Sequence, residues 1–126
     1  MLRADTLPET PVLADRDQLQ RALGNVLHNA IKFSPKNGVV CISAFTEDER
    51  VRIDVLDSGP GIPTPDLPRI FERFYRGDRS RRGAGTGLGL AIAKHVLQAH
   101  GGEMWAENTA GGGAKVSLTL IRSDST

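Results

Sequence analysis

A run of three alternating glycines, placed directly before a helical pattern, is the segment of this chain best suited to binding phosphate. The run reads Gly85-Thr86-Gly87-Leu88-Gly89-Leu90, and the pattern after it predicts a helix over 88–100 that ends at Gly101-Gly102. Glycines disfavour a helix interior but let the backbone come close to a ligand. The N–H groups and positive dipole end of the following helix attract anions. The competing interpretation is a flexible surface loop before an ordinary helix.

Two amides and an amine line one side of an earlier helical segment. Asn25, Asn29 and Lys32 are spaced i, i+4 and i+7, which places them on one helix face outside the apolar stripe. Amide oxygens are hard ligands of the kind that Mg²⁺ accepts, and lysine offers a point charge to phosphate. The pattern therefore predicts a contact with Mg²⁺ and phosphate, with a solvated helix face as the alternative.

A carboxylate followed by a glycine- and proline-rich loop comes directly after an apolar strand pattern. The loop is Asp57-Ser58-Gly59-Pro60-Gly61-Ile62. An ionised carboxylate accepts hydrogen bonds, so Asp57 is suited to the amino group of a flat base, and the glycines would permit that base to approach closely. The alternative is an ordinary turn, in which aspartate is a common residue.

Aromatic and arginine residues are concentrated between these two loops. The segment Ile70-Phe71-Glu72-Arg73-Phe74-Tyr75-Arg76 leads into an arginine- and glycine-rich stretch over 76–87, and residues 69–82 hold six arginines against two acidic residues. Guanidinium groups bind phosphate oxygens well, so Arg73 and Arg76 are suited to a lid over a triphosphate. The alternatives are aromatic core anchors and a solvated charged loop.

The patterns around these residues predict an α+β protein. A helix over 16–33 begins after Asp15 in a capping-box-like start, and its apolar stripe is Leu19, Leu23, Val26, Leu27, Ala30 and Ile31. Apolar and alternating runs predict strands over 39–46, 51–55, 103–108 and 114–121. A short helix is expected over 65–75 and a further short strand over 11–14. This order indicates helices on one face of a mixed sheet.

Size and composition fit one globular domain. The chain has 126 residues, of which 39% are apolar and 25% charged, and its net charge of +1 gives no general attraction to nucleic acid or membranes. Cys41 is the single cysteine, which excludes an intrachain disulfide and predicts a small core residue. No apolar run reaches the length of about 20 residues that a membrane span needs, and we expect no signal peptide. We therefore expect a cytoplasmic segment, whose parent protein could still be membrane-anchored.

Taken in order, the four segments resemble the sequence boxes of two-component sensor histidine kinases. Residues 25–35 resemble the N box, 57–62 the G1 box, 71–75 the F box and 85–90 the G2 box. The resemblance implies the ATP-binding catalytic domain of these kinases (HATPase_c, GHKL superfamily) over 12–122, with a linker over 1–11 and a tail over 123–126. It also implies a two-layer α/β sandwich, in which a mixed, mostly antiparallel sheet of about five strands carries three helices on one face.

The resemblance implies ATP and Mg²⁺ as ligands and carries roles to individual positions. Asn29 would ligate Mg²⁺ together with the ATP phosphates, with Asn25 as a second candidate. Lys32 would contact phosphate and Phe33 would lie against the nucleotide, while Asp57 would accept a hydrogen bond from the adenine amino group. The nucleotide-binding set implied in this way is Asn25, Asn29, Lys32, Phe33, Asp57, Gly59, Gly61, Ile62, Phe71, Arg73, Arg76, Gly85, Thr86, Gly87, Leu88, Gly89 and Leu90.

None of the three histidines lies in a phosphoacceptor motif of the His-Glu-x-x-x-Pro kind. His28 lies inside the N box, His95 lies in the last helix, and His100 is expected to cap that helix. We therefore expect the catalytic part of a larger kinase, monomeric in isolation and with no catalytic residue assigned within the chain. Its partners would be the phosphoacceptor and dimerisation domain and, indirectly, a response regulator.

Three other interpretations of the same boxes are considered. An anti-sigma-factor-like serine kinase of this superfamily is disfavoured by the F box and the arginine-rich segment. A nucleotide-binding module without turnover is compatible with intact boxes. A gyrase- or chaperone-type ATPase would carry a catalytic glutamate before Asn25, where this chain has Arg21-Ala22-Leu23-Gly24.

Overall fold

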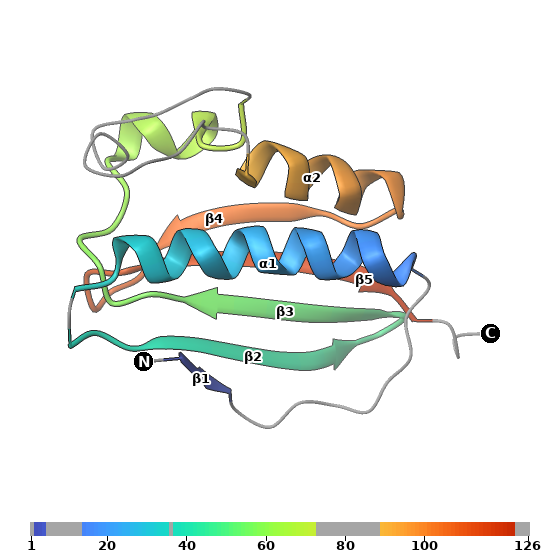
Figure 1. The fold of residues 1–126 in the computed structure, drawn as a ribbon, viewed down its shortest axis with the longest axis horizontal. Helices are drawn as coiled ribbons and strands as arrows, with labels where there is room; N and C mark the ends of the chain where they lie inside the picture. Colours follow the sequence, from blue (N-terminus) through green and yellow to red (C-terminus); the bar gives the residue numbers. More distant parts are fainter. Residues whose placement is uncertain (1, 5–13, 36, 73–88, 123–126) are drawn as a thin grey trace.

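Helices cover one face of a five-stranded sheet in the computed structural model, which describes residues 2–4, 14–35, 37–72 and 89–122 (Figure 1). This confirms the predicted α+β class. The elements in chain order are β1 (Leu2–Ala4), α1 (Arg16–Phe33), β2 (Val40–Glu47), β3 (Arg50–Leu56), the 3-10 helix η1 (Thr64–Arg69), α2 (Gly89–Ala99), β4 (Met104–Asn108) and β5 (Ala114–Ile121).

The sheet has the strand order β1-β2-β3-β5-β4 and is mostly antiparallel, as expected. The β2–β3 and β4–β5 hairpins lie side by side because β5 pairs with β3, with Val116 opposite Val55. Only β1 runs parallel to its neighbour, and Leu2 pairs with Val40 at the edge of the sheet. A linker was expected over 1–11, but residues 2–4 of it form a strand. The physical reason is that the edge strand β2 has backbone groups that need hydrogen-bonding partners, and β1 supplies them.

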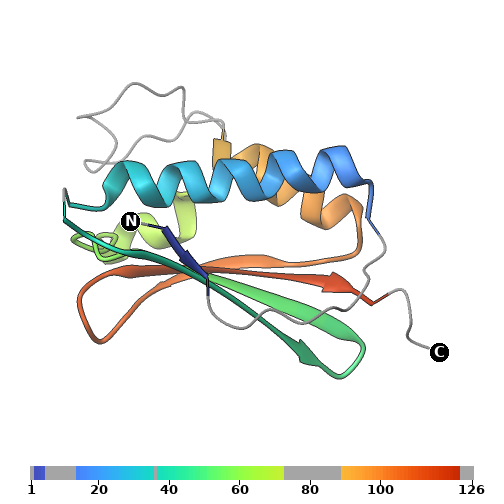
Figure 2. The same ribbon diagram turned by 60° about the horizontal axis from the view of Figure 1, so that its bottom comes forward.

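Helix α1 has the bounds that the sequence predicts, because local signals mark both of its ends. The Asp15 carboxylate caps the first turn by accepting a hydrogen bond from the Gln18 N–H at 2.9 Å. At the other end, the Ser34 N–H donates to the carbonyls of Ala30 and Ile31. Figure 2 shows α1 and α2 lying together above the sheet, in the helix layer that must position the residues of the N box.

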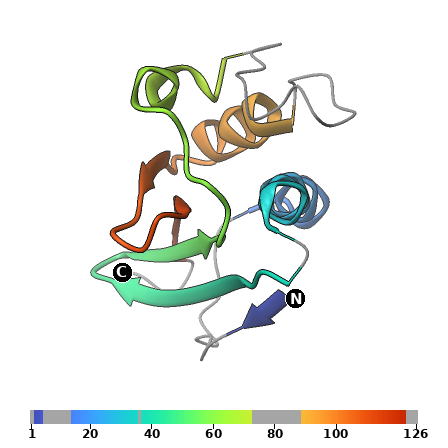
Figure 3. The same ribbon diagram turned by 90° about the vertical axis from the view of Figure 1, so that its left-hand side faces the viewer.

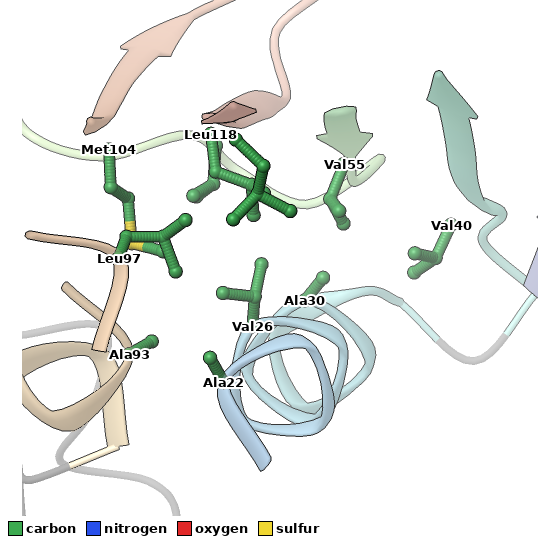
Figure 4. Packing of buried hydrophobic residues seen from close by; sticks show 11 residues of the cluster. Ala22, Val26, Ala30, Val40, Val55, Ala93, Leu97, Met104 and Leu118 are labelled. Atoms are coloured by element: carbon green, nitrogen blue, oxygen red, sulfur yellow. The ribbon is translucent and has the colours of Figure 1, made fainter. Parts of the chain in front are cut away.

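The core lies between this helix layer and the sheet (Figure 4). Its buried members from both layers are Ala22, Val26, Ala30, Val40, Val55, Ala93, Leu97, Met104, Val116, Leu118 and Leu120. Ile31 was expected in the apolar stripe, but 53% of its surface is exposed. The reason is helical geometry: Ile31 follows Val26 by five residues, which places it about 140° around the helix from the buried side.

The opposite face of the sheet carries a cluster of its own. Arg52 lies over the rings of Phe45 and Trp105, at 5.5 and 5.1 Å from the ring centres, and its Nε donates to the Asp54 carboxylate at 2.9 Å. This hydrogen bond raises the pKa of the Arg52 guanidinium above its usual value. Cys41 is half-buried and does not belong to the core cluster, so its prediction as a core residue was wrong. Strand alternation explains this, since Val40 on one side of it faces the core.

The remaining helices differ slightly from their predicted bounds. The helix expected over 65–75 is the 3-10 helix η1, which the prolines in Thr64–Arg69 favour over a longer α-helix, and it lies beyond the start of α2 in Figures 1 and 3. Ala14 forms a bend, while the rest of the short strand expected over 11–14 lies outside the described residues.

No helix in the described part of the chain has the length and apolar character needed to cross a membrane.

Candidate functional site

The predicted site residues that the structure describes come from four places: one flank of α1, the loop after β3, the segment after η1, and the start of α2. The end of α1, the end of β3 and the β4–β5 turn lie together at the left of Figure 1. We call this the loop end of the sheet, and it comprises residues 34–35, 37–39, 57–62 and 108–114.

The amide and amine row predicted on the first helix is present on α1. Asn25, Asn29 and Lys32 are all half-buried and lie along one continuous helix. The Asn25 amide Nδ2 donates a hydrogen bond to the carbonyl of Gly89 at 3.2 Å. This contact brings the N box against the first residue of α2, where the glycine-rich run ends. A Cβ added to Gly89 would lie 3.8 Å from the Asn25 Cβ, so the two backbones approach closely there.

Asp57 occupies the predicted position at the end of β3, and its backbone and side chain are both held. Its N–H donates to the Ala114 carbonyl at 2.9 Å, which continues the β3–β5 pairing by one step. Its Oδ1 accepts hydrogen bonds from the N–H groups of Gly59, at 2.9 Å, and of Ala114, at 3.3 Å. Two backbone donors therefore orient a half-buried carboxylate. A site that recognises a single hydrogen-bonding group of a ligand requires an acceptor oriented in this way.

Ser58 connects the loop after β3 to the segment between α1 and β2. Its Oγ accepts a hydrogen bond from the Val39 N–H at 2.8 Å and donates to the Val39 carbonyl at 3.1 Å. The hydroxyl lies so close to the chain that a Cβ on Gly38 would come within 2.5 Å of it. Ser58 was not among the predicted site residues, although its position inside the G1 box was a signal.

Asn108 holds the far end of the same loop. Its Oδ1 accepts from the Ile62 N–H and its Nδ2 donates to the Ile62 carbonyl, both at 2.7 Å. Gly61 has a φ of +82°, and a Cβ there would lie 3.0 Å from both the Asn108 Oδ1 and the Gly112 carbonyl. The chain's own packing therefore requires glycine at 61. Sequence reasoning missed Asn108, because its partner is 46 residues away and its position before a turn is ordinary for asparagine.

Two residues of the predicted set belong to the packing around the start of α2. Phe71 and Leu90 are half-buried and pack against the hydrophobic core. The Lys94 ammonium lies 4.9 Å from the centre of the Phe71 ring, which ties the segment after η1 to α2. Phe71 thus packs against the core, as the alternative for the aromatics expects, and its contact with the nucleotide stays a prediction.

Several predicted residues cannot be placed. The side chain of Phe33 and the residues Arg73, Arg76, Gly85, Thr86, Gly87 and Leu88 lie outside the described part of the structure. Within the described residues there is no group of three or more His, Cys, Asp or Glu side chains that could hold a metal. The candidate metal ligand remains the amide oxygen of Asn29, which is a hard donor of the type that Mg²⁺ prefers.

Known proteins match nearly the whole chain. The family of histidine kinase-, DNA gyrase B- and HSP90-like ATPases matches residues 14–124. The sensor histidine kinase WalK of Bacillus subtilis is 46% identical over 110 residues, which cover 84% of this chain but only 18% of WalK. The mycobacterial sensor histidine kinase MprB has a TM-score of 0.86 at 36% identity, covering 96% of this chain and 84% of the solved chain.

A further structure, full-length ShkA in complex with AMPPNP, has a TM-score of 0.80 at 33% identity and covers 97% of this chain and 26% of that one. The chain thus spans about a fifth of WalK and about a quarter of ShkA. These matches confirm the resemblance to the ATP-binding catalytic domain of sensor histidine kinases. Together with the sandwich fold and the ordered boxes, they show that this chain belongs to the histidine kinase-, DNA gyrase B- and HSP90-like ATPase family.

Proposed function

We propose that this chain binds Mg²⁺–ATP between α1, the loop end of the sheet and the start of α2. It would present the γ-phosphoryl group to a histidine on a separate phosphoacceptor and dimerisation domain of a cytoplasmic kinase region. The observation that carries the proposal is the Asn25–Gly89 hydrogen bond, because it joins the amide row of α1 to the start of the helix that follows the glycine run. Helix starts of this kind attract phosphate.

Adenine selection is assigned to Asp57. An ionised carboxylate accepts hydrogen bonds and cannot donate them, and two backbone N–H groups already orient its Oδ1. Adenine offers an amino donor where guanine offers a carbonyl acceptor, so guanine would leave two acceptors opposed. The glycines at 59 and 61 and the buried Ile62 would form the adjoining wall, which the hydrogen bonds of Gly59 and Ile62 keep in place.

The phosphate end is assigned to the flank of α1 and to residues beyond the described ranges. Asn29 would hold Mg²⁺ together with the ATP phosphates, and the ion would neutralise phosphate charge as the phosphoryl group moves. Lys32 would add a point charge beside it. Phe33, Phe71 and Leu90 would border the nucleotide. The further phosphate contacts in this proposal are Gly89 at the start of α2 and, outside the described residues, Arg73, Arg76, Gly85, Thr86, Gly87 and Leu88.

The phosphoacceptor is placed outside the chain, because no histidine here combines a phosphoacceptor motif with a free ring. His100 uses both ring nitrogens: Nδ1 contacts the Val96 carbonyl at 2.7 Å, and Nε2 accepts from the Asp15 N–H at 3.0 Å. His28 and His95 are exposed on helices but lie outside any motif of the acceptor kind. Catalysis would therefore consist mainly of positioning and of neutralising charge, and a response regulator would receive the phosphoryl group later.

Calorimetric titration with AMPPNP, with and without Mg²⁺, tests the binding step. We expect saturable 1:1 binding that Mg²⁺ strengthens, and much weaker binding of the guanine analogue. Equal affinity for the two bases would contradict the assignment of Asp57. A second experiment incubates the chain with radiolabelled ATP, alone and with a histidine-bearing domain of the parent kinase. Acid-labile label should appear only on that domain, and rapid stoichiometric labelling of the isolated chain would contradict the proposal.

A module that binds nucleotide without turnover is the remaining competitor. The same radiolabel experiment separates the two, since such a module would bind AMPPNP normally yet transfer nothing to any acceptor domain. Transfer between separate proteins should be slow and should rise with concentration, because a covalent tether normally supplies a high effective concentration.

A further inference from the structure

We propose that Asn108 is a positioning residue for adenine recognition, acting through the loop 57–62 rather than by touching the nucleotide. This inference rests on the proposed function, which places the adenine against that loop. It adds a residue outside the four sequence boxes, on the strand β4, to the machinery that selects the base.

The first step is the geometry of the Asn108 amide. It pairs with both the N–H and the carbonyl of Ile62 at 2.7 Å, as a neighbouring strand would pair with that residue. Both distances are at the short end of the range for N–H···O bonds. The orientation of the amide is determined by this pairing, because the Ile62 N–H must donate to oxygen and the Ile62 carbonyl must accept from nitrogen.

Few side-chain hydrogen bonds fix the loop 57–62 between its two ends. Ser58 ties the first part of the loop to Val39, and Asn108 ties the last part at Ile62. Gly59-Pro60-Gly61 lies between them and contains no side-chain donor or acceptor. Without the contact between Asn108 and Ile62, the Gly61 backbone could leave its left-handed conformation. The Gly59 N–H, which orients Asp57, could then also adopt other positions.

The third step is that the β4–β5 turn holds both ends of the loop. Asn108 stands at the start of the turn and binds Ile62, while Ala114 stands at its end and exchanges hydrogen bonds with Asp57. Within the turn, the Thr109 N–H donates to the Gly113 carbonyl at 2.8 Å, which keeps these two contacts in register. The β4–β5 hairpin therefore fixes the positions of the Asp57 carboxylate and of the loop wall beside it.

The test compares ATP with purine riboside triphosphate, which lacks the 6-amino group, by calorimetry on the intact chain. The wild-type chain should bind ATP at least about tenfold more tightly, a ratio that reports the hydrogen bond to Asp57. Asn108→Ala should weaken ATP binding by about tenfold and bring the ratio of the two affinities closer to one. A purely structural role would lower the melting temperature and leave that ratio unchanged.

A second variant and a matched control make the result decisive. Asn108→Asp keeps the size of the side chain and an acceptor for the Ile62 N–H, but it places an oxygen opposite the Ile62 carbonyl. This variant should lose less ATP affinity than Asn108→Ala, in the same direction. It also provides the test if Asn108→Ala does not fold. Glu107→Ala, on the same strand as Asn108, removes the 3.1 Å ion pair between β4 and Lys115 of β5 and should leave both affinities within about twofold.

The outcomes separate the inference from the function on which it rests. A wild-type ratio near one would overturn the assignment of Asp57, and the inference with it. A large wild-type ratio that both Asn108 variants preserve, with ATP affinity within about twofold of wild type, would overturn the inference and leave the proposed function standing. A ratio that falls in the Asn108 variants but not in Glu107→Ala supports it.

Discussion

At one end of the sheet, hydrogen bonds close the ends of regular elements, whereas at the loop end they hold an irregular backbone in place. The cap end, at the right of Figure 1, contains the start of α1, the end of α2 and the turn into β4. There, Gly101 has a φ of +75°, the Gly102 N–H donates to the Leu97 carbonyl, and His100 bridges Val96 to Asp15. These contacts complete ordinary helix caps.

The loop end uses similar contacts for a different result. Ser58 and Asn108 donate to and accept from the backbone of Val39 and Ile62, and neither of these contacts closes a helix. These contacts hold the loop of glycine and proline that carries Asp57, the carboxylate proposed to bind the base. We therefore propose that contacts at the cap end serve stability alone, while contacts at the loop end serve stability and ligand binding together.

The largest expected effects come from two matched glycines, one at each end. A Cβ at Gly113 would lie 1.9 Å from the Asp57 carbonyl oxygen, and a Cβ at Gly102 would lie 2.0 Å from the Thr119 carbonyl oxygen. Gly113→Ala and Gly102→Ala should each cost about 1–3 kcal/mol or more of folding free energy, because a backbone must shift. Measured by calorimetry below the melting temperature of both variants, ATP affinity should fall only in Gly113→Ala. Loss of binding in Gly102→Ala as well would remove the proposed division between the two ends.

Asp57→Asn should have the next largest effect, and Asp54→Asn on the preceding strand β3 is its control. The amide at 57 could still accept from Gly59 and Ala114, but it would turn an NH₂ group toward the adenine amino group. ATP affinity should fall by about 5- to 150-fold, which corresponds to about 1–3 kcal/mol, with little change in melting temperature. Asp54→Asn should reverse this pattern, since it weakens the bond to Arg52 on the opposite face. A similar ATP affinity in the two variants would contradict the assignment.

Asn29→Ala should affect the contribution of Mg²⁺ rather than the base. We expect the strengthening of AMPPNP binding by Mg²⁺ to fall by about fivefold, or about 1 kcal/mol, because one hard oxygen ligand is lost. Metal-free ADP binding should change less. His28→Ala, an exposed neighbour on α1, should leave both measurements as in the wild type. An unchanged Mg²⁺ contribution in Asn29→Ala would rule out Asn29 as the ligand.

His100→Ala should give the smallest change and should confine it to stability. The substitution removes the contacts to Val96 and to the Asp15 N–H at the cap end. Urea unfolding should show a loss of about 0.5–1.5 kcal/mol, the net value of hydrogen bonds of this type. AMPPNP affinity should stay within about twofold of wild type, and a larger loss would mean that α2 transmits changes at its end to the nucleotide site.

The amino-acid sequence by itself determined the features that depend on neighbouring residues. The Asp15 cap, the bounds of α1 and the bounds of β5 follow from capping chemistry and from hydrophobic periodicity. The end of α2 just before Gly101-Gly102 follows from the left-handed conformation that glycine allows at Gly101. The order of the four boxes indicated the family because it is a property of the linear chain.

Only the tertiary structure decided the features that depend on how distant segments meet. The pairing of Asn108 with Ile62 and of Ser58 with Val39, the exposure of Ile31 and the strand β1 are of this kind. Each depends on strand order and register, which place residues far apart in the chain at one end of the sheet. A local pattern carries no record of such distances, because the same asparagine before the same turn would be an ordinary surface residue if β4 ended elsewhere.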